Sequence, residues 1–245
     1  MTDLIARIDR TAGRLTLNRP PALNALTWEM VNEIEAALDE WRDDPAVKIV
    51  VIDAAGERAF CSGGDIAEMY ASGKRGDLDY GRRFWRDEYR LNNKIATYPK
   101  PVVTFLHGFT MGGGVGVGCH ASHRIVNDTS RIAMPEVGIG LIPDVGGTRL
   151  LADAPGHIGE YLGLTADRMD AGDAIFAGFA DHYVSDGWDD LKDQLCAAGD
   201  PTVIPHHPAP ESRLANWQHT IDPVFAGTTL KAIMTALPAD PPDAL

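Results

Sequence analysis

Two runs of mostly apolar residues, at 47–52 and 101–106, constrain the fold of this 245-residue chain more than any other feature. Neither run alternates between apolar and polar side chains, so each predicts a strand that is buried on both faces. The stretches at 66–70 and 82–96, which lie between the two runs, predict helices. Strands that alternate with helices along a chain predict a largely parallel sheet with right-handed crossovers.

Shorter elements are predicted on either side of this unit. Residues 4–8 and 14–17 alternate like two strands around a turn and predict a hairpin. Thr27 can cap a helix of about four turns, because the apolar residues that follow it recur at helical spacing. Two more short strands are expected at 123–126 and 131–133.

A proline-rich segment divides the chain near its C-terminal end. Residues 200–210 contain four prolines and predict a linker or a loop. We therefore expect a core over residues 1–199 and, over 200–245, a linker with a short helical segment whose helix covers 223–236. Hydrophobic residues make up 44% of the chain, which is enough for a sizeable buried core.

The charge and the cysteines exclude several classes of protein. A formal charge of −13, from 22 basic and 35 acidic residues, argues against nucleic acid as a partner. The three cysteines form no CxxC pair, so neither a disulfide framework nor a metal site is expected, and a reducing cytoplasm fits best. The sequence has no export-signal pattern and no run of about 18 apolar residues, so we expect no membrane association.

Two carboxylates stand eight residues apart in an apolar run that is punctuated by glycines. They are Glu136 and Asp144, in the stretch from Met134 to Gly147. A buried carboxylate costs several kcal/mol unless it is paired or hydrogen-bonded, so its presence needs a partner or a chemical use. Two carboxylates close together indicate acid–base or nucleophilic work.

Two glycine-rich turns follow predicted strands, one at 59–66 and one at 108–118. In the first, Gly63 and Gly64 precede Asp65, which can cap a helix. Exposed N–H groups at such turns can bind a developing oxyanion. Taken alone, the first turn is better explained as a plain connection, and the second equally well by close helix packing.

Five segments in order resemble the crotonase (enoyl-CoA hydratase/isomerase) superfamily. They lie at 17–26, 59–66, 98–101, 111–116 and 134–147. The resemblance covers roughly residues 4–195, and the closest branch looks like 3-hydroxyisobutyryl-CoA hydrolase. It implies the α/β crotonase (ClpP/crotonase-like) spiral of ββα units with a helical C-terminal part. It also implies an acyl thioester of coenzyme A as the ligand, with no cofactor beyond the coenzyme A of the substrate.

The resemblance also implies the site residues. Gly64 and Gly113 match the oxyanion hole, and Glu136 and Asp144 match the acids of the hydrolase branch. Glu88, whose place in an amphipathic helix would by itself predict a solvated residue, matches a substrate-site glutamate. The residues that match the coenzyme A contacts are Ala22, Leu23, Ala25, Ser62, Gly63, Asp65 and Ile66. Pro21 and Ala67 stand where the family often has basic residues.

Position 116 favours one reaction over the others. Hydratases resemble this chain but carry a second glutamate where Gly116 stands, because adding water to a double bond uses two acids. We therefore expect a thioester hydrolase that acts through an oxyanion hole and a Glu/Asp pair. An enoyl-CoA hydratase or isomerase and a non-catalytic acyl-CoA-binding protein remain as alternatives. Superfamily members commonly form trimers or dimers of trimers, so a homo-oligomer is expected.

Overall fold

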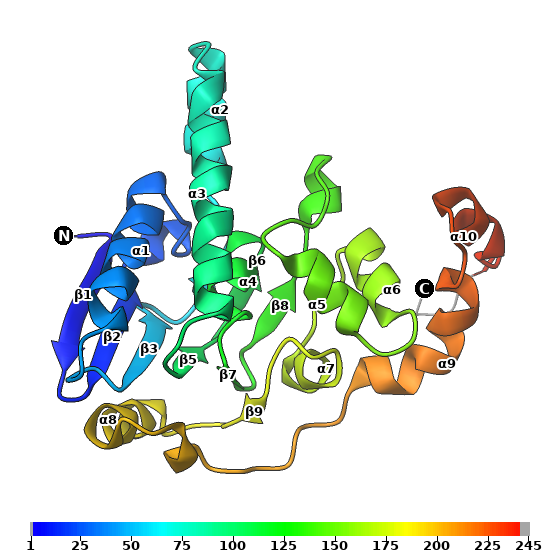
Figure 1. Cartoon of the computed structure of the whole chain (residues 1–245). Helices are drawn as coiled ribbons and strands as arrows, with labels where there is room; N and C mark the ends of the chain where they lie inside the picture. The colour runs from blue at the N-terminus through cyan, green and yellow to red at the C-terminus, as the bar shows by residue number, and fades with distance from the viewer. Residues whose placement is uncertain (1, 241–245) are drawn as a thin grey trace.

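A six-stranded sheet runs through the centre of the computed structural model, which describes residues 2–240 (Figure 1). In spatial order its strands are β1 (Leu4–Asp9), β2 (Ala12–Leu17), β3 (Ile49–Ala54), β5 (Val102–Phe105), β7 (His123–Val126) and β9 (His182–Tyr183). The β1–β2 pair is antiparallel and forms the predicted hairpin, whereas every other neighbouring pair is parallel. The prediction of a largely parallel sheet is therefore confirmed.

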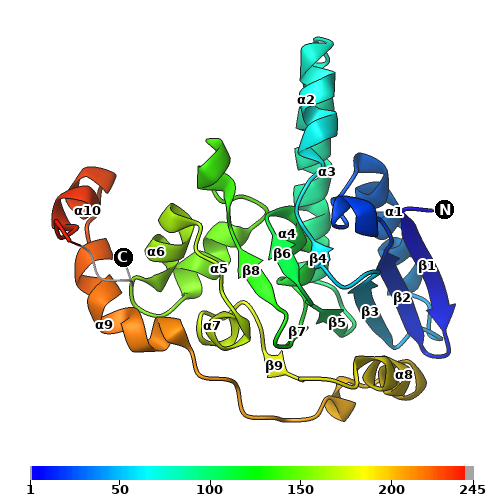
Figure 2. The same ribbon diagram turned by 180° about the vertical axis from the view of Figure 1, so that it is seen from behind.

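A second, smaller sheet consists of three parallel strands, which Figure 2 shows side by side. They are β4 (Ala59–Cys61), β6 (Phe109–Met111) and β8 (Arg131–Ala133). The chain visits the two sheets in alternation, so that β3, β5 and β7 are each followed by a strand of the small sheet. Helices complete the repeat, and the result is the predicted spiral of ββα units.

Helices lie on both faces of the large sheet, and further helices lie beside it. They are α1 (Trp28–Arg42), α2 (Ile66–Lys74), α3 (Leu78–Ala96), α4 (Gly113–Gly118), α5 (Gly147–Asp153), α6 (Ile158–Thr165), α7 (Ala171–Phe176), α8 (Trp188–Ala198), α9 (Arg213–Phe225) and α10 (Leu230–Ala236). The α1 helix begins as predicted, because the Thr27 hydroxyl accepts a hydrogen bond from the Met30 amide at 3.2 Å. The α2 and α3 helices project beyond the sheets in both views.

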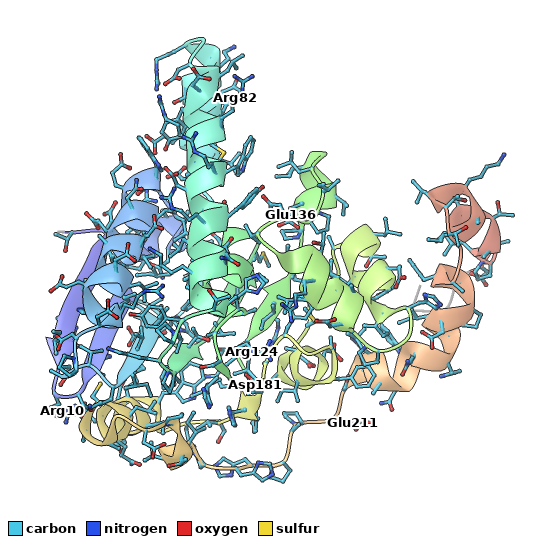
Figure 3. The ribbon with its side chains drawn as sticks, viewed as in Figure 1. Arg10, Arg82, Arg124, Glu136, Asp181 and Glu211 are labelled. Carbon is cyan, nitrogen blue, oxygen red and sulfur yellow. The ribbon has the colours of Figure 1, made fainter. Side chains whose placement is uncertain are left out.

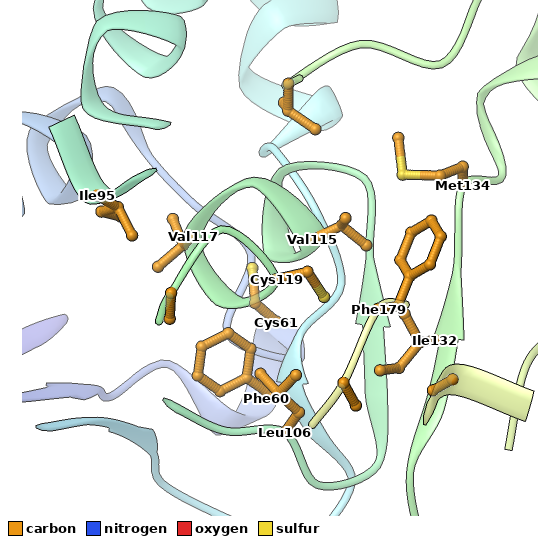
Figure 4. Close-up of a cluster of buried hydrophobic side chains, with 14 of the residues drawn as sticks. Phe60, Cys61, Ile95, Leu106, Val115, Val117, Cys119, Ile132, Met134 and Phe179 are labelled. Atoms are coloured by element: carbon orange, nitrogen blue, oxygen red, sulfur yellow. The ribbon is translucent and has the colours of Figure 1, made fainter. Parts of the chain in front are cut away.

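The two faces of β3 bury different side chains, as expected of a strand covered on both sides. Val50 and Ile52 join a large apolar cluster, whereas Ile49 and Val51 join a smaller one that packs against α8. Figure 4 shows the part of the large cluster that lies beneath α4, with Phe60 of β4 among its members. The large cluster therefore forms a continuous apolar layer beneath α4.

Two predicted helix bounds need correction. The α3 helix begins at Leu78 rather than at residue 82, because the Asp77 carboxylate accepts a hydrogen bond from the Tyr80 amide at 3.1 Å. The helix predicted over 223–236 is wrong, since two helices lie there, capped by Ser212 and Thr229. Proline is frequent at the start of helices, but here Pro223 lies inside α9. Residues 241–245 of the predicted segment lie outside the described residues.

A buried carboxylate fastens α9 to the core. Asp173 of α7 is fully buried and accepts hydrogen bonds from the Ser212 hydroxyl at 2.9 Å and the Leu214 amide at 2.8 Å. The Arg213 guanidinium also donates to this carboxylate, at 3.1 Å from Nη2. The segment after the proline-rich stretch is thus held by specific contacts, although the division of the chain near residue 199 stays a prediction.

Among the described residues, none of the helices combines the length and the apolar composition that a membrane span requires.

We expect Asp173→Asn to lower the free energy of unfolding by about 2–4 kcal/mol, because it removes the charge opposite Arg213 and leaves buried donors without a good acceptor. Urea unfolding followed by circular dichroism measures the change. Asp153→Asn is the matched control, because Asp153 forms an exposed ion pair with Arg149 that contributes about 0–1 kcal/mol. Equal losses in both variants would contradict the prediction.

Candidate active site

The site lies where the carboxyl ends of the three small-sheet strands meet α3. The turn after β4 supplies Gly63 and Gly64, the turn after β6 supplies Gly112 and Gly113, and the segment after β8 supplies Glu136. A cleft of about 90 Å³ lies between them. Its remaining walls come from Ser62, Ile66, Met69, Phe84, Trp85, Glu88, Pro135, Ile139, Leu141, Asp144 and Val145. The cleft is mostly apolar, with carboxylates as its charged groups.

The two predicted oxyanion amides lie side by side. Gly63 has φ of +112° and Gly112 has φ of +50°, and these backbone conformations turn the following amides toward each other. A methyl group added to Gly113 would lie 3.2 Å from the Gly64 nitrogen, so the two turns are in contact. Within residues 2–240, neither the Gly64 nor the Gly113 amide is a donor in a backbone hydrogen bond. Both N–H groups are therefore free to bind an oxyanion.

Glu88 is buried, with a side chain that is 2% exposed. The α3 helix that carries it is held against α1 by the Trp28 indole N–H, which donates to Asp87 at 2.8 Å. The carboxylate oxygen Oε1 of Glu88 has no hydrogen-bond partner among the described residues and lies against Gly113. Burial, with the nearby charges of Asp144 and Glu136, raises the pKa of Glu88 to about 8. Glu88 therefore keeps its proton at neutral pH.

Glu136 begins the short 3-10 helix Glu136–Ile139, and Figure 3 shows it between α3 and the α5–α6 part of the chain. Its side chain is 5% exposed, and Oε2 has no partner among the described residues. A methyl group on Gly112 would lie 3.0 Å from the other oxygen, Oε1. Burial, with a contribution from the charge of Asp144, raises the pKa of Glu136 to about 7. This is the range in which a carboxyl group serves as a general base near neutral pH.

Asp144 completes the acidic group from a loop. Its carboxylate accepts a hydrogen bond from the Tyr89 hydroxyl at 2.6 Å. The next residue, Val145, has φ of +48°, and its carbonyl is 2.7 Å from His120 Nε2. The structure therefore brings together all five of the residues predicted to carry the chemistry or the acyl group: Gly64, Glu88, Gly113, Glu136 and Asp144.

Asn92 lies next to the site and was not revealed by the sequence; it lines a neighbouring cavity rather than the cleft. It lies one helical turn after Glu88 on α3, is 3% exposed, and has no hydrogen-bond partner for either side-chain polar atom within the described residues. A methyl group on Gly116 would lie 2.7 Å from Asn92 Nδ2 and 2.9 Å from Oδ1. The Asn92 amide thus fills the space into which any side chain at position 116 would extend. The spacing from Glu88 was the one signal that could have indicated it.

The residues predicted to contact coenzyme A lie on two chain segments whose backbones are hydrogen-bonded to each other. The Ser62 amide donates to the Leu23 carbonyl at 3.0 Å, the Leu26 amide to Gly63 at 2.8 Å, and the Asp65 amide to Leu26 at 2.8 Å. Ser62, Gly63 and Ile66 line the cleft, whereas Leu23 lines a separate hollow. The other three, Ala22, Ala25 and Asp65, do not line the cleft, and Asp65 instead caps α2 and pairs with Arg19 at 3.1 Å.

The fold and this site define a protein of the crotonase class. The family model for enoyl-CoA hydratase/isomerase matches residues 12–244, and the chain belongs to this family. A crystal structure described as an enoyl-CoA hydratase from Rhodobacter sphaeroides 2.4.1 is 57% identical and superposes with a TM-score of 0.95 over 99% of this chain and 72% of that one. A carnitinyl-CoA dehydratase from Mycobacterium thermoresistibile is 46% identical, with a TM-score of 0.94 and the same coverage.

Curated relatives carry a different name. The mitochondrial 3-hydroxyisobutyryl-CoA hydrolase of Danio rerio is 45% identical over 78% of this chain and 50% of its own length. The Xenopus laevis protein of the same name is 40% identical over 94% of this chain and 63% of its own. The chain thus spans about half to two thirds of the length of these relatives. The relatives agree on the family and on acyl-CoA in their names, but not on the reaction.

We expect Glu88→Gln to stabilise the protein at alkaline pH. The pKa of Glu88 is about 8 in the fold against an ordinary 4.5, so the folded chain binds more protons between these values. The free energy of unfolding of the wild type therefore falls as the pH rises through this window, and glutamine removes that loss. The gain should be about 1–3 kcal/mol near pH 9 and should vanish near pH 5.

Urea unfolding at acidic, neutral and alkaline pH measures this difference. Glu40→Gln is the matched control, because Glu40 is an exposed glutamate on α1 and should leave the pH dependence of stability unchanged. A Glu88→Gln variant whose stability parallels the wild type at every pH would contradict the burial argument.

Proposed function

We propose that this protein hydrolyses acyl-CoA thioesters, with a 3-hydroxyisobutyryl-CoA-like substrate. One observation carries the proposal: among the described residues, the buried carboxyl groups of Glu136 and Glu88 each have an oxygen without a hydrogen-bond partner, and both groups line the same cleft as the Gly64 and Gly113 amides. A buried acid without a partner is costly, so this arrangement favours a bound ligand that completes it. The names of the curated relatives supply the class of acyl group.

The parts match the steps of thioester hydrolysis. The Gly64 and Gly113 amides bind the thioester oxygen and stabilise the negative charge that develops on it, at about 3 to 4 kcal/mol per donor. Glu136 either attacks the carbonyl carbon itself or removes a proton from the water that attacks it. If water attacks, the carbon–sulfur bond breaks and the thiolate of coenzyme A takes up the proton that Glu136 removed. If Glu136 attacks, the same bond breaks as a mixed anhydride forms, the thiolate takes up a proton from solvent, and water then hydrolyses the anhydride and restores Glu136. The net reaction consumes one water and yields the free acid.

The remaining acids orient the reactants. Glu88 holds a proton at neutral pH and can donate a hydrogen bond to the acyl group, whereas Asp144 can orient the water or bind a substrate hydroxyl. No metal is needed for these steps, and among residues 2–240 no cluster of side chains suits one. We propose that the substrate's own coenzyme A is the only cofactor present.

The hydratase alternative places a second acid on α4. Asn92 occupies the space beside Gly116, so a carboxylate at that position has no room in this packing. Glu88 approaches from α3 instead and would have to replace that acid. The isomerase alternative needs only Glu136, and a non-catalytic acyl-CoA-binding protein needs neither acid. Of these candidate functions, thioester hydrolysis is the one that uses Glu88, Glu136 and Asp144 together.

The wider setting is proposed from the family and from the charge and cysteine pattern of the sequence. We propose an acyl-CoA as the partner, no nucleic acid or membrane, and assembly into a trimer or a hexamer. A cytoplasmic location is also proposed, on the cysteine pattern of the sequence. The vertebrate relatives are named as mitochondrial proteins.

We expect Glu136→Gln to reduce thiol release from 3-hydroxyisobutyryl-CoA by at least about 1,000-fold while leaving binding of the ester within about threefold, because glutamine keeps the shape but cannot act as base or nucleophile. A chromogenic thiol reagent follows hydrolysis, and calorimetry on the variant follows binding. Crotonyl-CoA, followed by its double-bond absorbance, tests the alternatives in parallel. Glu40→Gln is the exposed control.

Three results would count against the assignment. Retained thiol release in Glu136→Gln would show that the reaction does not require Glu136. An absorbance change without thiol in the wild type would establish hydratase or isomerase chemistry. Binding without any product would support the non-catalytic alternative.

We expect the pH dependence of kcat/KM to be bell-shaped. The reaction needs Glu136 ionised, above its pKa of about 7, and Glu88 protonated, below its pKa of about 8. The two groups interact, so the limbs report the acidic cluster as a whole. Glu88→Gln should keep the acidic limb and lose the alkaline limb. An unchanged alkaline limb in that variant would contradict the role of Glu88 as a proton-bearing group.

A further inference from the structure

The Tyr89 hydroxyl is the side-chain donor that the described structure places on Asp144. The two residues are 55 positions apart, and the oxygen–oxygen distance is 2.6 Å. This distance lies in the range of charge-assisted O–H···O⁻ bonds, which are about twice as strong as neutral ones. Burial and this hydrogen bond raise the pKa of Tyr89, so the phenol remains a donor at any physiological pH.

Asp144 needs such a donor because its surroundings repel it. It lines the same cleft as Glu88 and Glu136, and its charge contributes to the raised pKa of each. It also lines a larger cavity of about 640 Å³, which Tyr89 lines as well. Without the hydrogen bond from Tyr89, the Asp144 carboxylate would be repelled by negative charge in the cleft and would have space to turn away from it.

The backbone of the loop is held separately. Val145 and Gly146 have φ of +48° and +76°, and the contact between His120 and the Val145 carbonyl fixes this turn at 2.7 Å. The loop thus keeps its course without Tyr89, and what the tyrosine hydroxyl adds is the direction of the Asp144 side chain. Tyr89 itself is 43% exposed, so its hydroxyl contributes little to the packed core.

We propose that Tyr89 is a positioning residue, which fixes the direction of the Asp144 carboxylate at the cleft when the neighbouring Glu136 is ionised. The inference rests on the proposed function, in which Asp144 orients water or a substrate hydroxyl. Tyr89 acts only through Asp144, so its contribution disappears when the carboxylate is absent. That dependence separates it from a residue that merely supports the fold.

A double-mutant cycle tests the proposal on the full chain. Tyr89→Phe should lower kcat for thiol release roughly 10- to 100-fold and leave KM within about threefold, because it removes one hydrogen bond to a charged group. Asp144→Asn should lower kcat at least as much, and the double variant should stay within about twofold of Asp144→Asn alone. Tyr183→Phe is the matched control, because the Tyr183 hydroxyl makes a similar 2.7 Å bond to Asp128 away from the site and should leave kcat unchanged.

Several outcomes overturn the inference. An unchanged kcat in Tyr89→Phe, an effect on KM alone, or multiplied losses in the double variant would each show that Tyr89 does not act through Asp144. Thermal melting of each variant confirms folding, and a kcat loss that parallels a lower Tm would also count against the proposal. Failure of the proposed function is recognised separately, in the wild type. If the wild type turns over crotonyl-CoA without releasing thiol, the double-mutant cycle is measured on that reaction instead. If the wild type shows no turnover at all, both the proposed function and the role of Tyr89 are contradicted.

Discussion

The parallel pairing of β4, β6 and β8 determines where the Gly64 and Gly113 amides and Glu136 lie. Parallel strands end at the same edge of a sheet, so the residues that follow them meet although they are far apart in the chain. The turn after β4 brings the Gly64 amide, the turn after β6 brings the Gly113 amide, and the segment after β8 brings Glu136. The large sheet and the apolar clusters hold these strands in register. Only Glu88 and Asp144 come from elsewhere, one from a helix that crosses this edge and one from a loop.

The electrostatics of the site follow from that geometry. A cleft lined by Phe84, Trp85 and Leu141 offers little solvation to charge, and two of its three acids are nearly inaccessible to water. Burial is the largest cause of the raised pKa of both Glu88 and Glu136, and repulsion from Asp144 adds to it. The fold therefore bears a free-energy cost at neutral and alkaline pH that a purely structural arrangement would avoid. Under the proposed function, the same raised pKa values allow Glu136 to act as a base and Glu88 to donate a hydrogen bond to the acyl group near neutral pH.

How far the sequence predicted this arrangement depended on the range of the interactions involved. The strands and glycine turns were predictable because local patterns define them, and the ordered motifs implied the acids. Residue patterns alone placed Glu88 on a solvated face, although Phe84 and Leu91 lie on the same face of the helix and are buried. Asn92 was missed because its importance lies in contact with α4, which no local pattern records. The wrong helix at 223–236 has the same origin, since the position of α9 depends on Asp173, some 40 residues earlier.

The contact between Asn92 and Gly116 restricts what position 116 can hold in this chain. Similar proteins that are 57% and 45% identical to this chain are named a hydratase and a hydrolase, so their names do not select one reaction. A side chain on α4 at position 116 would meet the Asn92 amide within 3 Å, so an acid there requires a smaller or displaced residue on α3. Under the proposed function, this packing leaves Glu88 of α3, rather than a residue of α4, as the acid that lines the cleft together with Glu136.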